Sequence, residues 1–401
     1  MSGRTMFAEP RSIRRGVTLT LVFGAVLATG AATGSFGRAA EGDPAPAAVR
    51  TRPRPYTPAA DRLDAARLAR AIDDGAVGPQ DAAALVSRSG DRWAAFYTAQ
   101  EYEGFQQELD GRYTGVGLWV RRAPDGVVRV SRVQDASPAR RAGVRTGDRL
   151  VAVDGTAVTG RPVTEVVARL RGAGGDPDAT AAPRPGSPVR LVLRRGARDR
   201  TVTLRRAVLT AETVTVSRPG PGILQIAVDS FPHGTAGRVR RALAAGDHRR
   251  GVLLDLRGNS GGLVTEAVEV ASAFLDGGLV ARYDVHGRTR SLYAAQGGDT
   301  TTPLVVLVDG GTMSAAELLA GALQDRGRAV VAGSPTFGKG SVQMPSTLPD
   351  GSVAELTVGH YRTPSGRTVD GHGIRPDLTV AGGRDAGAAA ETVLSGLGTA
   401  S

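Results

Sequence analysis

The sequence predicts an α+β protein of several domains, in which a helical N-terminal segment and a compact β-rich domain precede an α/β core. The chain has 401 residues, enough for two or three domains with separate hydrophobic cores. Residues 112–208 alternate apolar and polar side chains with the period of β-strands. Residues 209–380 instead repeat a buried strand, a glycine-rich turn and a helix, which is typical of an α/β domain with functional loops at the strand ends.

The first 58 residues are predicted to hold an export segment and a linker. A basic cluster precedes an uncharged run from Gly16 to Thr33 that is rich in valine, leucine and alanine, as in a signal peptide or a short membrane anchor. We assign residues 1–40 to this segment, which would bind the membrane if it stays uncleaved. Residues 41–58 are proline-rich and form a linker. The folded part is therefore expected to be extracytoplasmic, in the cell envelope, either membrane-anchored or secreted.

Residues 59–111 are predicted to be helical, because apolar residues such as Leu63, Leu68 and Ile72 recur near one helical face. The β-rich domain of residues 112–208 follows. It is expected to contain a hairpin that turns at 124–126, a helical turn at 137–143, a strand at 148–155, an amphipathic helix at 163–171 and two strands within 189–208. An insertion near 173–187, rich in proline and glycine, interrupts it.

The α/β core of residues 209–380 is predicted to bring three glycine-rich loops together. Its strands are nearly continuous apolar runs, as expected for a sheet covered on both faces. They lead into the loops "RGNSGG", "DGGTMS" and "SPTFGKG". Because the carboxyl ends of parallel strands lie at one edge of a sheet, the three loops should line one crevice. Residues 381–401 are predicted to form a C-terminal tail.

The net charge of +11 does not indicate a nucleic-acid-binding protein. The first 55 residues hold eight arginines against three acidic residues, and the remaining excess is scattered in pairs. Aromatic residues make up only 4% of the chain, so few side chains could stack on bases. The chain has no cysteine, and no group of histidines and carboxylates has metal-ligand spacing. We therefore expect no nucleic-acid partner, no disulfide, no metal and no other cofactor.

Lys339 is the only lysine in the chain, among 50 lysines and arginines. Unlike arginine, a lysine can be driven neutral by burial and can then accept a proton. The count alone does not separate a catalytic lysine from one left over in an arginine-biased chain. The uncharged loop around it, with Phe337 as an apolar neighbour, favours a lowered pKa. If residues 339–343 are extended, Lys339 and Gln343 face the same side, and the Gln343 amide can orient the amine by a hydrogen bond.

Ser314 is the candidate nucleophile, at the turn between a buried strand and a helix. The pattern from Ser314 to Glu317 also fits a capping box, a structural motif in which both side chains bind free helix amides. The position at a helix N-terminus favours catalysis, because backbone N–H groups there can bind an oxyanion. The glycines of "RGNSGG", Gly261 and Gly262, supply further N–H groups that can approach closely.

These motifs resemble the carboxyl-terminal processing (tail-specific) serine proteases, a PDZ-containing family of the Ser/Lys type. Residues 312–317 are similar to the family's serine motif, and residues 336–343 match its T-F-G-K-G-x-V-Q loop throughout. The lysine follows the serine by 25 positions, as in the family. The resemblance covers residues 59–380 and implies a protease core at 209–380. The implied activity is that of a serine endopeptidase that cleaves proteins near their C-termini.

The resemblance assigns roles to five residues of the core. It implies that Ser314 is the nucleophile, Lys339 the general base and Gln343 the residue that orients the base. It implies an oxyanion hole formed by the backbone N–H groups of Gly261 and Ala315.

The resemblance identifies residues 112–208 as a PDZ domain. In its loop, glycines let backbone amides turn toward a terminal carboxylate, and the strand that follows can pair with an extended peptide beside the helix at 163–171. The loop residues are Gly115, Val116, Gly117 and Leu118. The expected partners are unstructured C-terminal tails of protein substrates, and a homo-oligomer stays open.

Two other classes of function also stay open. The chain could be a non-catalytic scaffold protein that only binds peptides through its PDZ domain. It could also be a hydrolase of another class, in which His360 or His372 activates the serine. No G-x-S-x-G elbow surrounds any serine, and neither histidine lies in a motif that marks a catalytic triad.

Overall fold

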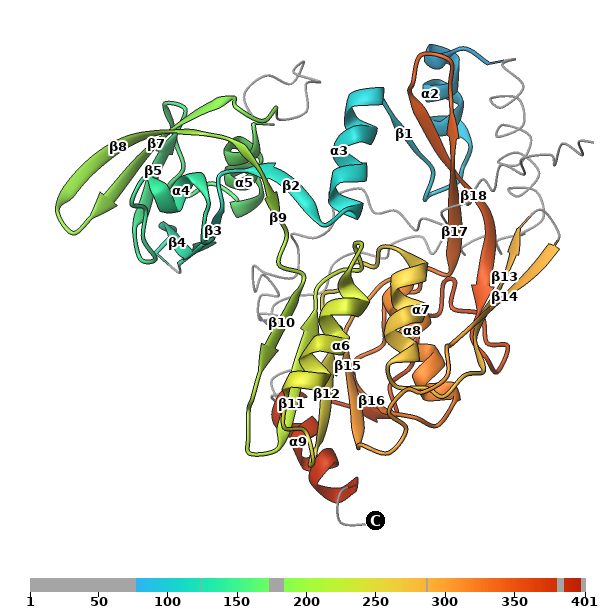
Figure 1. Ribbon diagram of the computed structural model, residues 1–401. Helices are drawn as coiled ribbons and strands as arrows, with labels where there is room; N and C mark the ends of the chain where they lie inside the picture. The colour runs from blue at the N-terminus through green and yellow to red at the C-terminus, as the bar shows by residue number, and fades with distance from the viewer. Residues whose placement is uncertain (1–76, 124, 173–183, 286–287, 381–385, 398–401) are drawn as a thin grey trace, which may run out of the picture.

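The structure, a computed structural model, describes residues 77–123, 125–172, 184–285, 288–380 and 386–397 (Figure 1). The predicted signal peptide or anchor, the linker and residues 173–183 of the predicted insertion lie outside this part. None of the helices within it is both long enough and apolar enough to cross a membrane. The described chain forms a β-rich domain and a larger α/β core, with an N-terminal segment that packs on the core (Figure 1).

The α/β core is built on a six-stranded sheet in which only one edge strand, β10, runs antiparallel to its neighbour. Every residue of the central strands β12 and β15 is buried, because helices cover both faces of the sheet. In spatial order the strands are β10 (Val214–Ser217), β11 (Ile223–Val228), β12 (Gly251–Asp255), β15 (Leu304–Val308), β16 (Val330–Gly333) and β19 (Leu378–Thr379).

Helices α6 (Thr235–Ala245), α7 (Val264–Ser272) and α8 (Ala315–Asp325) pack on one face of this sheet, in the main hydrophobic core. Helix α9 (Ala386–Leu397) covers the other face, where Leu394 is buried against β12 and β15. Part of the segment predicted to be a C-terminal tail is therefore a helix of the core. Its alanine-rich sequence has few large apolar residues, so their spacing did not predict a buried helix.

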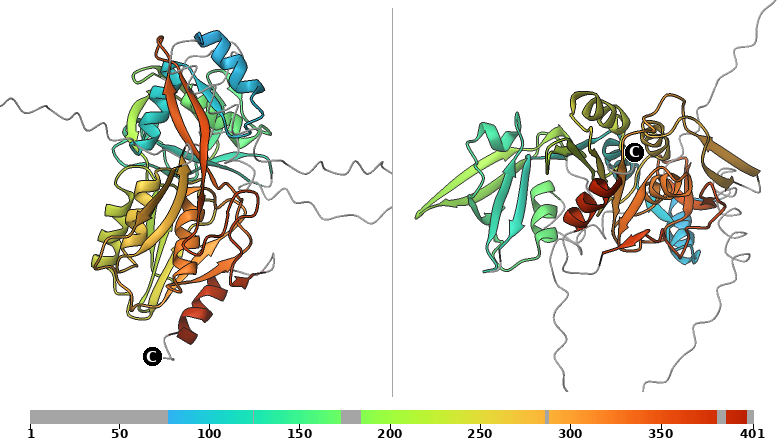
Figure 2. Two further views of the ribbon diagram at one scale, coloured as in Figure 1. Left: turned by 90° about the vertical axis from the view of Figure 1, so that its right-hand side faces the viewer. Right: turned by 90° about the horizontal axis from the view of Figure 1, so that it is seen from below.

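The strand that follows the lysine loop belongs to a second, antiparallel sheet. Its long central strand is β18 (Val353–Arg362), which pairs with β17 (Ser341–Thr347) in a hairpin. Figures 1 and 2 show this hairpin rising from the core beside helix α2. The same sheet contains β13 (Leu279–Val285), β14 (Arg288–Tyr293) and a short strand from the N-terminal segment, β1 (Ala95–Tyr97).

The N-terminal segment contains two helices within its described part, α2 (Pro79–Arg88) and α3 (Ala99–Leu109). Helix α3 begins with a capping box formed by Thr98 and Glu101. Strand β1 lies between the helices, and its pairing with β18 attaches the segment to the core. The prediction of a purely helical segment missed this strand, because three residues are too few to show a strand period. A separate helical cap stays a prediction.

The β-rich domain is a sheet in the order β3-β4-β5-β7-β8, with helix α5 (Val163–Arg171) beside β3. Its core includes the fully buried Leu150, Val166 and Leu191. Strand β3 lies at the edge of the sheet, so one of its sides has no neighbouring strand within the described residues. The strands are β3 (Leu118–Arg122), β4 (Val128–Val133), β5 (Arg149–Val153), β6 (Thr156–Ala157), β7 (Pro188–Arg195) and β8 (Arg198–Arg205), with helix α4 (Pro138–Arg141).

A two-stranded stem joins the β-rich domain to the rest of the chain (Figure 1). Strand β2 (Arg112–Gly115) enters the domain and pairs antiparallel with β9 (Ala207–Thr210), which leaves it. The domain therefore projects to one side of the core, and its ends lie close together, as is usual for an inserted domain.

Candidate active site

Ser314 lies where the buried strand β15 turns into helix α8. The loop before it is hydrogen-bonded to the loop after β12. The Thr312 hydroxyl donates to the Leu256 carbonyl at 2.8 Å, and the Met313 N–H donates to the Asn259 carbonyl at 2.9 Å. The serine loop and the "RGNSGG" loop thus meet at the carboxyl edge of the sheet, as the strand order predicts.

The backbone of Ser314 is strained and its hydroxyl is unpaired. Its φ of 59° and ψ of −118° lie in a region that residues other than glycine rarely occupy. Its N–H donates to Glu317 Oε2 at 2.8 Å. Its buried Oγ has no hydrogen-bond partner. Of the two hydrogen bonds of the predicted capping box, only the one from the Ser314 N–H to Glu317 therefore forms. The Ser314 hydroxyl is available to react.

Gly261 lies directly against the serine. A methyl group on its Cα would lie 3.0 Å from the Ser314 Cβ and 3.3 Å from the Ala315 nitrogen. Ala315 is the first residue of α8, so its N–H has no carbonyl acceptor within the helix. The Gly261 N–H, however, donates to the Asn259 side chain at 2.8 Å. One donor of the predicted oxyanion hole is thus occupied in this structure, because the asparagine side chain closes the turn.

Glu317 ties the serine turn to the lysine loop. Its buried carboxylate accepts from the Ser314 N–H, from the Gly338 and Lys339 N–H groups at 2.7 and 2.9 Å, and from the Thr336 hydroxyl at 2.5 Å. Burial raises the pKa of Glu317, and these donors oppose the rise. A residue predicted only as a helix cap therefore fixes the distance between the candidate nucleophile and the candidate base.

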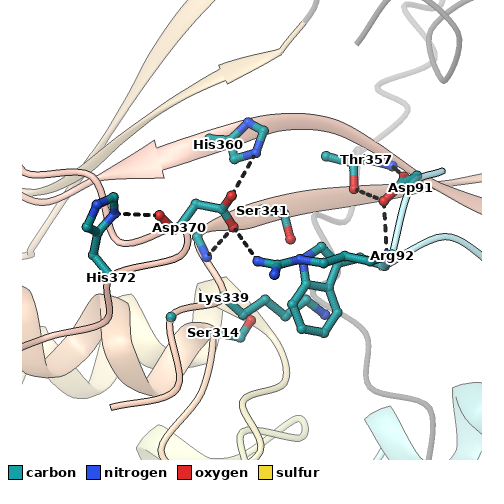
Figure 3. Close-up of polar contacts among 12 residues, drawn as sticks. Asp91, Arg92, Ser314, Lys339, Ser341, Thr357, His360, Asp370 and His372 are labelled. Carbon is teal, nitrogen blue, oxygen red and sulfur yellow. Dashed lines mark hydrogen bonds and ion pairs between the residues drawn. The ribbon is translucent and has the colours of Figure 1, made fainter. Parts of the chain in front are cut away.

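Lys339 is 1% exposed and lies in the same part of the site as Ser314 (Figure 3). Its Nζ is 4.8 Å from the centroid of the Trp93 ring. Because Ser314 Oγ has no partner, the serine and the lysine are not hydrogen-bonded to each other in this structure. Burial lowers the pKa of Lys339 to about 7, although the charges of Glu355, Asp91 and Glu317 oppose the change.

The apolar neighbour of the lysine differs from the one predicted. Trp93, from the segment before β1, lies next to the amine. Phe337 is 42% exposed and packs against the Trp93 ring edge-on, with 5.8 Å between the ring centroids. The lowered pKa thus has the predicted cause, burial, but a distant segment of the chain supplies much of it.

Gln343 is completely buried beside the lysine loop. Its Nε2 donates to the Ser341 hydroxyl at 2.8 Å and to the Thr357 hydroxyl at 3.2 Å, and the Thr357 hydroxyl donates to Asp91 at 3.0 Å. Its Oε1 has no hydrogen-bond partner. The predicted hydrogen bond from Gln343 to the lysine amine is therefore not made here, and the amide is held instead by a chain that ends at Asp91.

The two candidate histidines contact Asp370 rather than the serine (Figure 3). His360 Nε2 lies 3.5 Å from an Asp370 carboxylate oxygen, and His372 Nδ1 lies 2.8 Å from the Asp370 carbonyl oxygen. Neither is hydrogen-bonded to Ser314, whose hydroxyl has no partner. This arrangement does not favour a histidine-dependent hydrolase.

The predicted peptide-binding loop joins β2 to β3 in the β-rich domain. Gly115 ends β2, and Leu118 begins β3. Val116 is buried, and its carbonyl accepts from the Ala139 N–H at the start of α4. Gly117 has a φ of 77°, and a side chain there would collide with Ser137. The loop is thus held closely against α4, at the start of the edge strand β3.

Comparison with known proteins identifies two domains. Residues 222–380 match the profile of peptidase family S41. Residues 129–177, within the β-rich domain, match the profile of the PDZ domain. The resemblance found in the sequence is confirmed, as are the PDZ domain and the protease core of the predicted fold.

Curated proteins similar to this chain bear the names of serine proteases. It is 30% identical over 326 residues to a probable CtpA-like serine protease of Staphylococcus haemolyticus (strain JCSC1435), and 30% identical over 325 residues to one of Staphylococcus aureus (strain COL). Each alignment covers 80% of this chain but only 61% of the relative. A solved structure, the photosystem II D1 C-terminal processing protease, is 28% identical, with 80% of this chain and 93% of that chain covered and a TM-score of 0.49.

Three residues of the site were not predicted from the sequence. Asp91 and Trp93 come from the N-terminal segment, and Glu355 comes from the middle of β18. None lies in a motif, and Asp91 and Trp93 are more than 200 positions from Ser314 in the sequence. Only the pairing of β1 with β18 brings this segment to the lysine.

Proposed function

We propose that this protein is an extracytoplasmic serine endopeptidase that cleaves protein substrates near their C-termini, with Ser314 as nucleophile and Lys339 as general base. One observation carries the proposal. A buried lysine whose pKa is lowered to about 7 shares the site with a strained serine whose hydroxyl has no other partner. At neutral pH such an amine is partly neutral and can accept a proton, which an ordinary lysine cannot do efficiently.

In the proposed mechanism, the Lys339 side chain turns from the Trp93 ring toward Ser314, and its neutral amine takes the proton of Oγ. The Oγ attacks the carbonyl carbon of the scissile peptide bond, and the carbonyl oxygen becomes an oxyanion. The Ala315 N–H would bind this oxyanion, joined by the Gly261 N–H once it leaves Asn259. The ammonium then gives its proton to the leaving amine, and the same base activates the water that hydrolyses the acyl-enzyme.

The Gln343 amide supports the base in this proposal. Its Nε2 is held by Ser341 and Thr357, which leaves its Oε1 as a buried acceptor without a donor. An ammonium that forms during the attack is the kind of donor that this oxygen lacks. We therefore assign Gln343 to orienting the protonated lysine.

The PDZ domain would bind the C-terminal tail of the substrate. An extended peptide can add to the free edge of β3, with α5 as the other wall of the groove and the 115–118 loop at its end. Main-chain pairing of this kind suits unstructured tails, because the backbone N–H and C=O groups of such a tail are not already paired within a fold. The location outside the cytoplasm rests on the sequence of residues 1–40 alone.

The proposal is tested with the purified full chain and a disordered protein that has an apolar C-terminus. Wild type, Ser314→Ala and Lys339→Arg are compared for cleavage and for binding of a peptide with the same C-terminus. We expect cleavage only by the wild type and binding by all three. Binding without any cleavage would indicate the non-catalytic scaffold. Cleavage that survives Lys339→Arg but is lost in His360→Asn would indicate the histidine-dependent class.

A further inference from the structure

Glu355 is a buried carboxyl group that the proposed mechanism does not use. Its side chain is 0% exposed, and neither of its carboxyl oxygens has a hydrogen-bond partner. Buried carboxyl groups are normally paired or hydrogen-bonded, because the charged form is poorly stabilised away from water. A carboxyl group in such a position requires an explanation.

The sheet register turns Glu355 toward the active site. In β18 the neighbouring residues Ala354 and Leu356 belong to a hydrophobic cluster on one face of the sheet. Because side chains alternate along a strand, Glu355 and Thr357 point to the opposite face. On that face, Thr357 is hydrogen-bonded to Gln343. On this face of β18, Glu355 is therefore next to Thr357, the residue that is hydrogen-bonded to Gln343.

Unpaired oxygens gather around this face. Glu355 lies opposite Ala95 in β1 and Pro345 in β17, so Tyr97 and Gln343 lie two residues away on the adjacent strands. The Tyr97 hydroxyl and Gln343 Oε1 are also buried without partners. Among the described residues, buried side-chain oxygens without a partner occur only in Tyr97, Ser314, Gln343 and Glu355. Three of these four residues, Tyr97, Gln343 and Glu355, therefore lie on this face of the sheet.

The charges of Lys339 and Glu355 interact with each other more strongly than with any other charged group. Among charged groups, Glu355 has the largest effect on Lys339, and Lys339 is the one charged group with a resolved effect on Glu355. Burial lowers the pKa of Lys339 and raises the pKa of Glu355, so the buried site favours the neutral form of both groups.

Other titratable groups also face this pair. Asp91 and Glu317 favour the ammonium form of Lys339, and Arg92 disfavours it. Tyr97 from β1 and Tyr102 from α3 are affected by the charge of Glu355, and burial raises the pKa of both. The remaining groups around Tyr97 are Glu101 and Glu108 of α3.

We propose that Glu355 is a positioning residue whose charge acts through space to set the protonation state of the catalytic base, Lys339. In one form the carboxyl group holds the proton and the amine is neutral, ready to accept the proton of Ser314. In the other form the proton lies on the amine, and the carboxylate is its counter-charge. The pair has zero net charge in both forms, so neither form leaves an uncompensated charge in the buried site. This inference rests on the proposed role of Lys339 as the base.

The single lysine allows a direct test. When the full chain is labelled with [ε-¹³C]lysine, it gives one lysine side-chain signal, whose chemical shift against pH reports the protonation of Lys339. Ser314→Ala prevents self-cleavage during the measurement. We expect a titration in two steps, because proton loss from Lys339 is coupled to proton loss from Glu355. In Glu355→Gln we expect a single step with its midpoint lower by about 1 pH unit or more, because no carboxylate stabilises the ammonium.

A matched control is Glu103→Gln, which removes the same charge from an exposed site on α3 that has no resolved effect on Lys339. It should leave the two steps unchanged. If Glu355→Gln does not fold, Glu355→Met replaces the unpaired carboxyl group by an apolar side chain of similar volume and should also give a single, lower step. Identical single-step titrations in the parent chain and in the Glu355 variants would overturn the inference.

An activity measurement separates this positioning role from a structural one. In Glu355→Gln with Ser314 intact, the acid limb of kcat/KM should move to lower pH while KM stays unchanged. A purely structural role would lower activity at every pH without moving the limb. If the wild-type chain cleaves no substrate, the proposed function fails. The lysine titration still decides whether Glu355 sets the protonation state of Lys339.

Discussion

The replacement of Lys339 by arginine is the sharpest test of the proposed chemistry. The substitution keeps a long cationic side chain but removes the ability to become neutral, because arginine stays protonated in proteins. The base must be neutral to accept the proton of Ser314. A loss of activity would therefore follow from proton chemistry rather than from a lost positive charge.

The size of the loss follows from the fraction of neutral side chain. With a pKa of about 7, about nine tenths of Lys339 is neutral at pH 8. The pKa of an arginine lies so far above this pH that only roughly 10⁻⁵ or less of its side chains are neutral. We therefore expect kcat/KM to fall by about 10⁴-fold or more, to the level that substrate binding and the oxyanion site supply alone.

The assay measures kcat/KM for a disordered fluorogenic substrate with an apolar C-terminus, between about pH 5 and pH 9. For the wild type the amine works in its deprotonated form, so activity should rise with pH and level off above the pKa of Lys339, near 7. Lys339→Met, which removes the amine without adding a charge, should match Lys339→Arg in activity. Melting curves and binding of the C-terminal peptide show whether both variants are folded.

The reasoning would be refuted if folded Lys339→Arg kept more than about 1% of the wild-type activity, because a neutral arginine is far too rare to supply it. A wild-type profile that is flat between pH 5 and pH 8 would also contradict a base with a pKa of about 7.

Three further substitutions test the surroundings of the site. Gly261→Ala should lower kcat/KM by about 100-fold or more, because its methyl group would lie 3.0 Å from the Ser314 Cβ at the oxyanion site. Gly258→Ala, in the same loop with no atom within 4 Å of the added methyl, is the matched control and should stay within about tenfold. Trp93→Ala admits water to the amine, so the pKa of Lys339 should rise and the acid limb should move to higher pH; an unmoved limb would mean that Trp93 does not desolvate the base. Glu317→Gln exchanges an acceptor oxygen for a donor and should lower the free energy of unfolding by about 1–3 kcal/mol in urea titrations, whereas unchanged stability would contradict the four hydrogen bonds at this carboxylate.

The local elements of the fold were predictable because their signals lie in neighbouring residues. The helix expected at 163–171 coincides with α5, and the apolar runs before the glycine-rich loops are β12, β15 and β16. Strand β1 and helix α9 were missed, since one is three residues long and the other is rich in alanine and glycine. Both are defined by what they pack against, and a window of sequence does not contain that partner.

The candidate site was likewise predictable only in part. Ser314, Lys339 and Gln343 could be selected from two short motifs and their spacing. All three are buried in the structure, and Figure 3 shows Ser314 and Lys339 in the same part of the site. The hydrogen-bond partners within the site could not be predicted from the sequence. The sequence does not show that Asn259 occupies the Gly261 N–H, or that Gln343 is held by Thr357 instead of the lysine amine. Each of these bonds depends on the direction of a side chain within the folded site.

The sequence by itself determined the domain order, the loops that carry the chemistry and the single residue able to act as a neutral amine. Tertiary structure alone decided the environment of that amine. Trp93 and Asp91 approach it from a segment more than 200 positions away, and Glu317 hydrogen-bonds the backbone of both the serine and the lysine. The charge of Glu355 acts on it from β18. The physical reason is that a motif specifies backbone conformation locally, whereas a pKa depends on burial and on charges that act through space.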